Sequence, residues 1–503
     1  GGVSTVADYW LGIDIGTSAC KVVAIDHRAQ VVASASAEYP LHTPRPGWSE
    51  QDPADWWAAT ETAVRAVIGR LTQPSAVRGI GLCGQMHGLI PLDSADRVIR
   101  PAILWNDQRT EPQCQAIVAR VGGSAALLKL TDNRMLPGYT AGKILWLREN
   151  EPDSFQRMRR FLNPKDFLRL KMTGDHVTDV SDASGTGLFD VRRRAWSTEL
   201  IAALDLPEQI FPRVVESSEV TGTLRADVAR RWGLLAGIPV VGGGGDAVLQ
   251  TTAMGVTGPG LLGITLGTAG IVAGAADSCP ENPDGLLQVS CGNAPDRWHV
   301  MGVTLNAGGA FHWLRNALAP LAAKHNLGFD RLIELAAGSP PGARGLLFLP
   351  YLSGERCPHV APHARGTWLG LTTQHDVGDL VRSVLEGALF NLRQILDLCV
   401  TAGLGTDEIR VSGGATREQL WLQLLADILG TQVSTVAGGE HGGAFGAALL
   451  AGVGTGHWPS LTAATGEIRT SATVQPNPAN VAEYEAAYQN FRSVFSHVEP
   501  LFT

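Results

Sequence analysis

Charged residues are scarce in this sequence, and they form no basic run. Asp, Glu, Lys and Arg make up 17% of the 503 residues, and the net charge is −8. Proteins that bind nucleic acid through its phosphates use clustered Lys and Arg, so neither DNA nor RNA is an expected partner. Apolar residues are abundant instead, at 45% of the chain, which predicts a folded globular protein.

Cysteine is also sparse, and no two cysteines have the spacing of a metal site or a redox motif. Seven are present, at positions 20, 83, 114, 279, 291, 357 and 399. Their odd number and the lack of a C-x-x-C pair predict free thiols in a reducing compartment. No basic segment followed by an apolar one opens the sequence, so we expect a cytoplasmic protein that is not exported.

One long stretch lacks charge altogether, and it raises the question of a membrane helix. Residues 247–276 contain no Asp, Glu, Lys or Arg, which is long enough to span a bilayer. Pro259 and seven glycines interrupt the stretch, and such residues break helices. We therefore predict buried strands and turns in a protein that does not bind membranes.

The length of the chain and an internal similarity predict two domains. A single hydrophobic core rarely grows beyond roughly 250–300 residues. Three strands are predicted near the start of the chain, at 9–15, 21–26 and 31–37. A similar set follows about half a chain later, at 260–266, 271–275 and 298–305. We interpret the pair as a duplication, with domains at 1–256 and 257–503; chance is the alternative, because Gly-Thr turns between apolar runs are common.

Local signals also predict where two helices begin and end. Asp52 and Pro53 are typical of a helix start, and Gly69 of its end, with Trp57, Val64 and Val67 on the buried face. In the second half, Thr416 and Gln419 have the spacing of a capping box, and Gly430 ends the helix that would follow.

The two best-known nucleotide motifs do not apply. The sequence has no G-x-x-x-x-G-K-[S/T] loop. A G-x-G-x-x-G does occur at Gly79, Gly81 and Gly84, but it lies inside a predicted strand rather than between a strand and a helix. We interpret these glycines as close strand packing and not as a dinucleotide site.

Two glycine-containing turns are better candidates for binding phosphate. Small residues, hydroxyls and free backbone N–H groups follow Asp14 in the first turn, at Gly16, Thr17 and Ser18. Asp14 could then hold Mg²⁺ directly or through water, or it could simply flank a turn. The second predicted hairpin offers a similar turn, with Gly267 and Thr268 at its start. Two such hairpins facing each other would bind a triphosphate from both sides.

A run of four glycines ends in a single carboxylate. Residues 242–245 are all glycine, and Asp246 follows at the start of a predicted helix. A carboxylate there could accept a proton from an attacking hydroxyl, or it could be an ordinary N-cap. Later, Gly413, Gly414 and Ala415 also precede a helix, where a flat ring or a phosphate could approach. A plain junction between loop and helix is the alternative there.

Taken together, these segments resemble the FGGY carbohydrate kinases, and within that family most of all the xylulokinases. The resemblance covers nearly the whole chain, in consistent order and spacing. The motifs that carry it are LGIDIGTSACKVVAID at the first hairpin, WSEQDPADWW at 48–57, GLCGQMHG at 81–88, RPAILWNDQRT at 100–110, GYTAGKILWLREN at 138–150, NPKDFLRLKMTG at 163–174, SDASGTGLFD at 181–190, VVGGGGD ending at Asp246, LPYLSGERCPH at 349–359 and SGGATREQLWLQLLAD at 412–427.

The resemblance implies an α/β fold of two actin/Hsp70-like (ribonuclease H-like) ATPase domains, each with a mixed central sheet flanked by helices, that close on a cleft. It implies phosphorylation of D-xylulose by ATP with Mg²⁺, with Asp246 as the base and Asp14 organising metal and phosphate. The implied nucleotide residues are Gly16, Thr17, Ser18, Gly267, Thr268, Gly413, Gly414 and Ala415. The implied sugar residues are Gln85, Met86, His87, Gly88, Trp105, Asn106, Asp107 and Asp246.

One departure from the family pattern keeps other acceptors open. Xylulokinases commonly have an asparagine after the catalytic aspartate, whereas this chain has Ala247. Another pentulose or polyol, such as ribulose or glycerol, is therefore an alternative substrate. A non-enzymatic ATP-driven switch of the same fold is a further alternative, although it would not need Asp246 or the polar MHG and WND segments. A homodimer is compatible with the sequence, which does not determine the oligomeric state.

Overall fold

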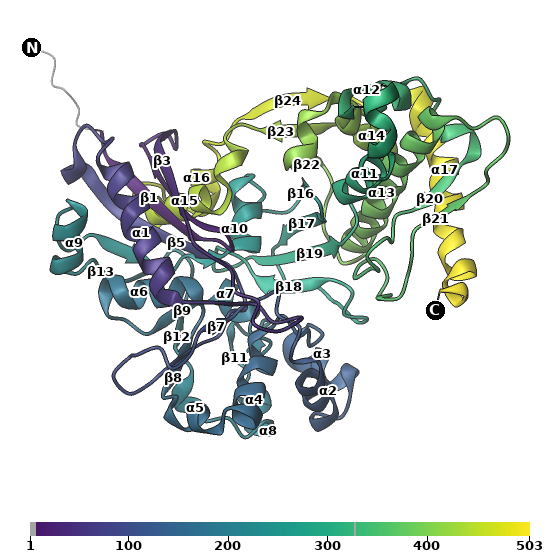
Figure 1. Ribbon diagram of the computed structural model, residues 1–503. Coiled ribbons are helices and arrows are strands. Elements are labelled where there is room, and N and C mark those ends of the chain that lie inside the picture. Colours follow the sequence, from purple (N-terminus) through teal and green to yellow (C-terminus); the bar gives the residue numbers. More distant parts are fainter. Residues whose placement is uncertain (1–6, 326–327, 503) are drawn as a thin grey trace, which may run out of the picture.

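The computed structural model describes residues 7–325 and 328–502, which form two lobes side by side (Figure 1). Within these residues each lobe contains a seven-stranded mixed sheet. The first sheet comprises, in spatial order, β13 (Val220–Thr223), β14 (Pro239–Val241), β5 (Val77–Gly84), β1 (Tyr9–Ile15), β2 (Ala19–Ile25) and β3 (Val31–Glu38), with β15 (Gly244–Gly245) also paired to β5. The second comprises β18 (Gln288–Cys291), β19 (Trp298–Thr304), β17 (Gly270–Ala276), β16 (Leu261–Leu266), β22 (Glu408–Ser412), β23 (Val433–Val436) and β24 (Thr470–Val474).

The second sheet repeats the arrangement of the first. In each, an antiparallel hairpin (β1 with β2, β16 with β17) is extended on one side by a third antiparallel strand and on the other by a parallel strand. The six strands predicted from the sequence therefore form, with their ends shifted by a residue or two, and the repeat agrees with a duplication. Short two-stranded ladders accompany the sheets, namely β4 (Glu50–Gln51) with β7 (Ala102–Ile103), β6 (Ile90–Leu92) with β8 (Arg160–Leu162), β9 (Val177–Asp179) with β12 (Arg213–Val215), β10 (Phe189–Asp190) with β11 (Ala195–Trp196), and β20 (Leu347–Leu349) with β21 (Thr367–Leu369).

Helices accompany both sheets, and only some of them lie on the sheet faces. Those from the first half are α1 (Pro53–Ile68), α2 (Glu111–Arg120), α3 (Ser124–Thr131), α4 (Thr140–Asn150), α5 (Pro152–Arg157), α6 (Pro164–Thr173), α7 (Val180–Ser184), α8 (Thr198–Ala203), α9 (Ala226–Trp232) and α10 (Asp246–Ala253). Those from the second half are α11 (Gly308–His325), α12 (Phe329–Ala337), α13 (Val377–Thr401), α14 (Gln419–Leu429), α15 (Gly442–Gly454), α16 (Leu461–Thr465) and α17 (Pro478–Val498).

Helix α1 has the predicted ends but a slightly different buried face. Asp52 is its N-cap, with the carboxylate accepting a hydrogen bond of 2.9 Å from the Ala54 N–H. Trp56 is 0% exposed, whereas Trp57 is half-buried. Eleven residues make almost three full helical turns, so Trp56 lies directly in line with Val67, whereas Trp57 is rotated away. The prediction that Trp57 belongs to the buried face was therefore wrong by one residue, because Trp56 holds that place.

A helix from each half of the chain packs against the sheet of the other lobe. Helix α15 lies on β1 and β5, so close that a Cβ on Gly12 or Gly81 would be 1.8 Å from a carbonyl oxygen of the helix. The prediction that the G-x-G-x-x-G marks close packing of a strand is therefore confirmed at Gly81. Helix α10 contacts the second lobe through a 2.8 Å hydrogen bond between Thr251 Oγ1 and His299 Nε2. The division at 256 and 257 stays a prediction, because α15 comes from the second range but packs on the first lobe.

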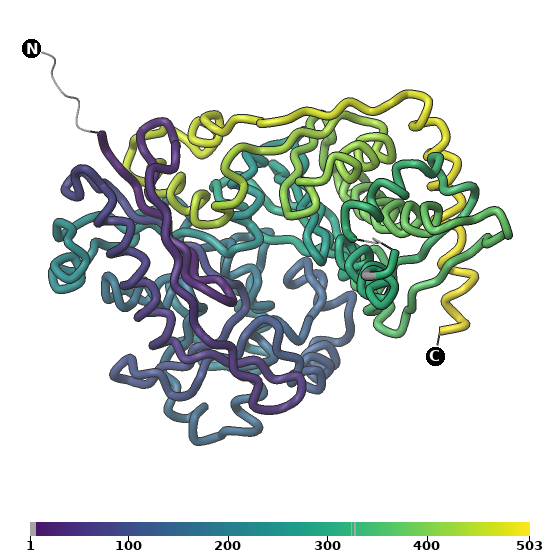
Figure 2. The backbone as a smooth tube through the Cα atoms, turned by 45° about the horizontal axis from the view of Figure 1, so that its top comes forward, coloured from purple at the N-terminus to yellow at the C-terminus, as the bar shows by residue number. Residues whose placement is uncertain are grey.

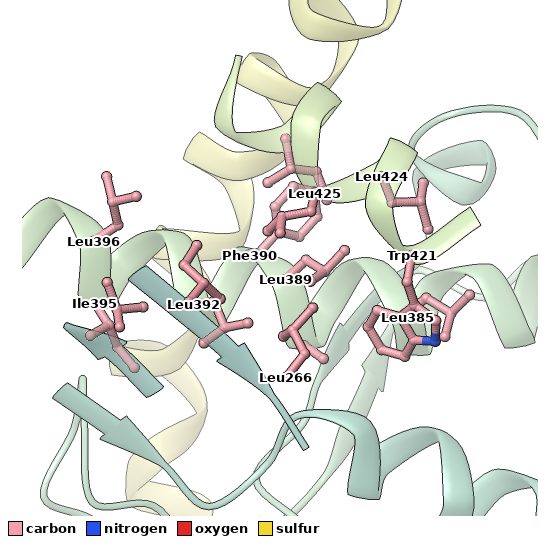
Figure 3. Close-up of a cluster of buried hydrophobic side chains, with 14 of the residues drawn as sticks. Leu266, Leu385, Leu389, Phe390, Leu392, Ile395, Leu396, Trp421, Leu424 and Leu425 are labelled. Carbon is pink, nitrogen blue, oxygen red and sulfur yellow. The ribbon is translucent and has the colours of Figure 1, made fainter. Parts of the chain in front are cut away.

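The second lobe has its own core, and the chain ends in it. In Figure 3, Leu385 and Leu389 of α13 and Trp421 of α14 lie in one cluster with Leu266 of β16. After α15 and α16 the chain crosses back over both lobes, as the yellow tube in Figure 2 shows, and α17 packs on the second lobe. The charge-free residues 247–276 form α10, β16 and β17. No helix in the described part of the chain is long and apolar enough to cross a membrane.

Candidate active site

The carboxyl ends of three parallel strands bring the candidate residues to one edge of the first sheet. β5 lies between β1 and β15, with Cys83 opposite both Asp14 and Gly244 in the ladder. Neighbouring strands are about 4.8 Å apart, so the backbones at Asp14 and Gly244 are about 10 Å apart. Asp246 follows directly after β15. Two carboxylates far apart in sequence therefore flank one strand end.

Asp14 is a carboxylate with a free oxygen. Its Oδ1 is buried and accepts no hydrogen bond within residues 7–325 and 328–502. Burial raises the pKa of Asp14 to about 6, against the opposing effects of the Cys83 thiol and the Lys21 charge. The first turn of α15 closes over it, since a Cβ on Gly443 would be 3.4 Å from Asp14 Oδ2. An unsatisfied carboxylate oxygen fits a hard cation.

A metal at this position would need ligands from outside the protein. Within the described chain, no three His, Cys, Asp or Glu side chains gather in a way that could hold a metal ion. Mg²⁺ is commonly held by one or two carboxylates together with substrate phosphates and water. Asp14 therefore fits Mg²⁺ that arrives with a nucleotide.

Asp246 is the first residue of α10 rather than its N-cap. The N-cap position is Gly245, and Asp246 Oδ1 accepts a 2.8 Å hydrogen bond from the adjacent Ala247 N–H. The alternative of an ordinary N-cap is therefore wrong. Burial raises the pKa of Asp246 to about 7, and the negative charge of Asp14 raises it further against backbone hydrogen bonds. A carboxylate poised near neutrality is suited to accept a proton.

The glycine run before Asp246 is fixed by its surroundings. Gly243 has φ +74°, and a Cβ there would be 2.0 Å from the Leu82 carbonyl oxygen. Arg169 donates hydrogen bonds to the carbonyl oxygens of Val241 and Gly242. The Gly245 N–H donates to Ser181 Oγ at 3.1 Å. The loop that carries Asp246 is thus held at both ends by side chains from the segment 163–190.

Behind this loop lies a cluster of buried charges that the sequence reasoning missed. Lys165 Nζ lies 2.8, 2.7 and 2.8 Å from carboxylate oxygens of Asp166, Asp179 and Asp182, and all four side chains are fully buried. Buried charges of this kind persist only when they are paired. Lys165 and Asp166 lie in the motif NPKDFLRLKMTG and Asp182 lies in SDASGTGLFD, but no sequence pattern indicates that these charges are buried and paired.

His87 is held as a neutral ring in a left-handed backbone conformation. Its φ is +78°, and its carbonyl oxygen accepts from Thr140 Oγ1 at 2.9 Å and Lys143 Nζ at 3.2 Å. Its Nδ1 lies 2.6 Å from the Gly185 carbonyl oxygen, which can only accept, so Nδ1 carries the hydrogen. Burial lowers the pKa of His87 to about 3, with the Lys143 charge the next cause. Nε2 is therefore a hydrogen-bond acceptor.

Met86 and Tyr139 surround this histidine. Met86 is buried, and a Cβ on Gly245 would be 2.5 Å from its Cγ, so it packs directly under the Asp246 loop. The Tyr139 ring is 4.9 Å from that of His87. His87, Met86 and Asp246 thus belong to one site, and Tyr139 is a neighbour that the sequence reasoning did not name.

Several other predicted sugar residues lie behind the site. Gln85 is buried and donates to Gln51 Oε1 at 3.0 Å, and a Cβ on Gly88 would be 2.9 Å from Pro164. Asp107 is fully buried, with its carboxylate bound by the Ser49 N–H at 2.8 Å and by the guanidinium of Arg109. Gln85, Gly88 and Asp107 thus each contact neighbouring protein groups, and their contact with a sugar stays a prediction.

Their neighbours on the segment 105–107 are more open. Trp105 is 44% exposed and donates from Nε1 to Thr17 Oγ1 at 2.9 Å, which joins it to the first turn. Asn106 Oδ1 is buried and accepts no hydrogen bond in the described chain. Trp105 and Asn106 remain candidates for contact with a ligand.

The two predicted phosphate turns each connect the strands of a hairpin, and the first turn is one residue longer than the second. The Gly16 N–H donates to the Ala19 carbonyl at 3.0 Å, and the Gly267 N–H donates to the Ala269 carbonyl at 3.0 Å. Ser18 and Thr268 are exposed, each at the tip of its turn. Helix α11 begins against the second turn, where the Gly308 N–H donates to the Gly267 carbonyl at 2.8 Å.

The candidate adenosine segment starts beside the second turn. Gly413 has φ +104°, and a Cβ there would be 2.2 Å from the Leu266 carbonyl oxygen. Gly414 is exposed with open space around it. The predicted capping box is wrong, because Thr416 Oγ1 donates back to the Gly413 carbonyl at 2.6 Å. Residues Gly414–Arg417 form the 3-10 turn η4, and α14 begins at Gln419 without a side-chain cap.

Comparisons with known proteins agree with this geometry. The family model for the N-terminal domain of the FGGY family of carbohydrate kinases matches residues 9–255, and that for the C-terminal domain matches 262–455. A xylulose kinase of Escherichia coli (strain K12) is 38% identical over 98% of this chain and 99% of its own length.

Solved structures give the same result for the fold. The crystal structure of a xyloylose kinase from Brucella ovis has a TM-score of 0.91 at 37% identity, covering 98% of this chain and 100% of that one. A gluconate kinase from Lactobacillus acidophilus has a TM-score of 0.92 at 25% identity and covers 99% of each chain. The predicted fold class of two actin/Hsp70-like α/β domains is confirmed. Since one fold carries kinases named for different acceptors, the fold alone does not select the sugar.

Proposed function

The chain belongs to the FGGY family of carbohydrate kinases, and we propose that it transfers the γ-phosphate of ATP to D-xylulose, giving D-xylulose 5-phosphate and ADP. The observation that carries this proposal is Asp246, a partly buried carboxylate at the start of α10 and next to Met86, whose pKa is raised to about 7. A switch protein of the same fold would not need a base there. The full-length similarity to xylulose kinases supports D-xylulose as the acceptor.

In this proposal the two lobes supply different parts of the reaction. Residues 1–256 bind the sugar, through Met86, His87, Trp105 and Asn106, and residues 257–503 bind most of the nucleotide. The turns at 16–18 and 267–268 bind phosphates through backbone N–H groups, and 413–415 lies along the adenosine. Asp246 accepts the proton of the attacking hydroxyl. Mg²⁺ held near Asp14 would neutralise charge on the phosphates.

The identity of the acceptor is tested by the panel of sugars the enzyme phosphorylates. Ala247, which follows Asp246, has no amide to bind a sugar hydroxyl. Related acceptors should therefore be tested beside D-xylulose. We expect ADP release with Mg-ATP to be fastest with D-xylulose, in a coupled assay against D-ribulose, L-ribulose, glycerol and gluconate. A higher kcat/KM for another of these would reassign the substrate. Hydrolysis of ATP that no sugar stimulates, but a peptide does, would contradict a sugar kinase altogether.

The raised pKa of Asp246 predicts how activity depends on pH. A base acts only when it is deprotonated, and the pKa of Asp246 in the free enzyme is about 7. We therefore expect kcat/KM for the sugar to be constant well above pH 7 and to fall as pH drops through about 7, approaching tenfold per unit. The pKa of His87, about 3, predicts no further loss from that ring between pH 5 and 8. A pH-independent kcat/KM from 5.5 to 8 would contradict the assignment of the base.

A further inference from the structure

Arg356 is an exposed cation on an otherwise tightly fixed loop. Within residues 7–325 and 328–502, its guanidinium makes no hydrogen bond and no ion pair. Its backbone N–H donates to Glu355 Oε1 at 2.8 Å, and Glu355 is only 3% exposed. The segment LPYLSGERCPH that contains it has no role in the mechanism above.

The loop of Arg356 is joined to the second phosphate turn. Glu355 accepts hydrogen bonds from Thr304 Oγ1 at 2.6 Å and from Asn391 Nδ2 at 2.9 Å. Thr304 ends β19 and lies opposite Gly270 in the ladder, at the end of the second turn. Beside it, Asn306 Nδ2 donates to the Gly354 carbonyl at 2.7 Å. Arg356 therefore projects from a rigid unit that includes the predicted phosphate turn at 267–268.

On its other side, Arg356 lies near His87 of the proposed sugar site and its neighbour Tyr139, since its charge acts on both. Its positive charge is close enough to oppose the rise in the pKa of Tyr139, which burial takes to about 12. After burial and Lys143, it also contributes to the low pKa of His87. The two lobes are in contact at Asn133, six residues before Tyr139 in the sequence. Asn133 makes two hydrogen bonds of 2.8 Å to the backbone of Val289 in β18.

Two other cations of the first lobe near the site, Lys143 and Lys21, are already engaged. Lys143 is buried and donates to the carbonyl oxygens of His87 and Gly138, and burial lowers its pKa to about 7. Lys21 donates to the Glu440 carbonyl at 2.6 Å. A guanidinium without a partner, between a phosphate turn and a sugar pocket, has the geometry and charge to bind a phosphoryl group through two N–H donors.

We propose that Arg356 binds the phosphoryl group during its transfer, and the phosphate of the sugar product afterwards, from the opposite side of the cleft to Asp246. The inference rests on the proposed function. In the transfer, the bond between the γ-phosphorus and the β,γ-bridging oxygen breaks as the sugar oxygen bonds to phosphorus, and the hydroxyl proton passes to Asp246. Arg356 donates hydrogen bonds to non-bridging oxygens of the γ-phosphoryl group, where charge is distributed in the transition state.

Replacement of Arg356 by Ala tests the proposal, with Arg365→Ala as the matched control. Arg365 is an exposed arginine of the same loop that donates to its neighbour Ala364. We expect Arg356→Ala to lower kcat by about 10²–10³ while KM for ATP and for sugar stay within about threefold, because the contact strengthens in the transition state. Arg356→Lys keeps the charge but loses the fork, so about a tenfold loss is expected. Arg365→Ala should behave as wild type.

Two further readouts separate a contact with the phosphoryl group from a contact with a sugar hydroxyl. Added guanidinium should restore part of the activity of Arg356→Ala and have no such effect on Arg365→Ala. The sugar phosphate should also inhibit Arg356→Ala more weakly than wild type. A raised sugar KM with unchanged kcat would place Arg356 on a sugar hydroxyl and overturn the proposal, as would wild-type kinetics. Failure of the proposed function is distinct, because it would appear in the wild-type enzyme as no phosphorylation of any pentulose.

Discussion

Replacement of Asp246 by Asn is expected to lower kcat by about 10²–10⁴, because the amide cannot accept the proton of the attacking hydroxyl. The substitution keeps the size and shape of the side chain, and the Asn oxygen can still accept the hydrogen bond from the Ala247 N–H. A partly buried charge is removed, so folding should be unimpaired or slightly favoured. The binding of Mg-ATP, measured by fluorescence or calorimetry, should change little.

The control for this variant is the same change at a helix start remote from the site. Asp227 lies in the first turn of α9, just as Asp246 lies in the first turn of α10. Unlike Asp246, Asp227 is exposed. Asp227→Asn should retain full activity. If Asp246→Asn folds normally, by thermal melting and circular dichroism, and keeps more than about a tenth of wild-type turnover, the general-base role fails. Its residual activity should also lose the dependence on pH near 7.

The sequence predicted the parts of the fold that local chemistry determines. The first hairpin and α1 form almost where expected, because apolar runs separated by a Gly-Thr-Ser turn and a cap with proline fix them within a few positions. The glycine run before Asp246 was also identified correctly as a place of close backbone approach. Each of these features depends on residues less than about twenty positions apart, within the reach of pattern reasoning.

Features that depend on distant residues could not be predicted in this way. Nothing near Asp107 in the sequence shows that the Ser49 N–H binds its carboxylate. Lys165 and the three carboxylates around it come together from α6, β9 and α7, and no periodicity predicts their pairing. Thr416 and Gln419 match a capping box by spacing, yet the threonine hydroxyl bonds to Gly413 instead. In each case a long-range or competing hydrogen bond outweighed the local signal.

The packing of α15 on the first sheet is the strongest of these long-range constraints, and Gly81→Ala tests it. A Cβ at Gly81 would lie 1.8 Å from the Ala447 carbonyl oxygen and 2.5 Å from its carbon. Both are backbone atoms, so no side-chain rotation can relieve the clash, and the helix must move away from β5. The buried cluster that contains Ala444, Ala447 and Leu249 would lose its close packing. We expect a loss of about 3 kcal/mol or more in the free energy of unfolding.

The change should also reach the active site, which distinguishes it from a simple loss of stability. Gly443, in the first turn of α15, lies against Cys83 and Asp14, so a displaced helix opens the surroundings of the Asp14 carboxylate. Gly81→Ala should therefore lower kcat even at temperatures where it remains folded. Gly258→Ala is the control, because a Cβ there meets nothing within 4 Å. Its free energy of unfolding should be within about 0.5 kcal/mol of the wild-type value. Urea unfolding followed by near-UV circular dichroism and by activity measures both effects. Equal unfolding midpoints for Gly81→Ala and Gly258→Ala would mean that the close packing of α15 on β5 does not contribute to stability in this way.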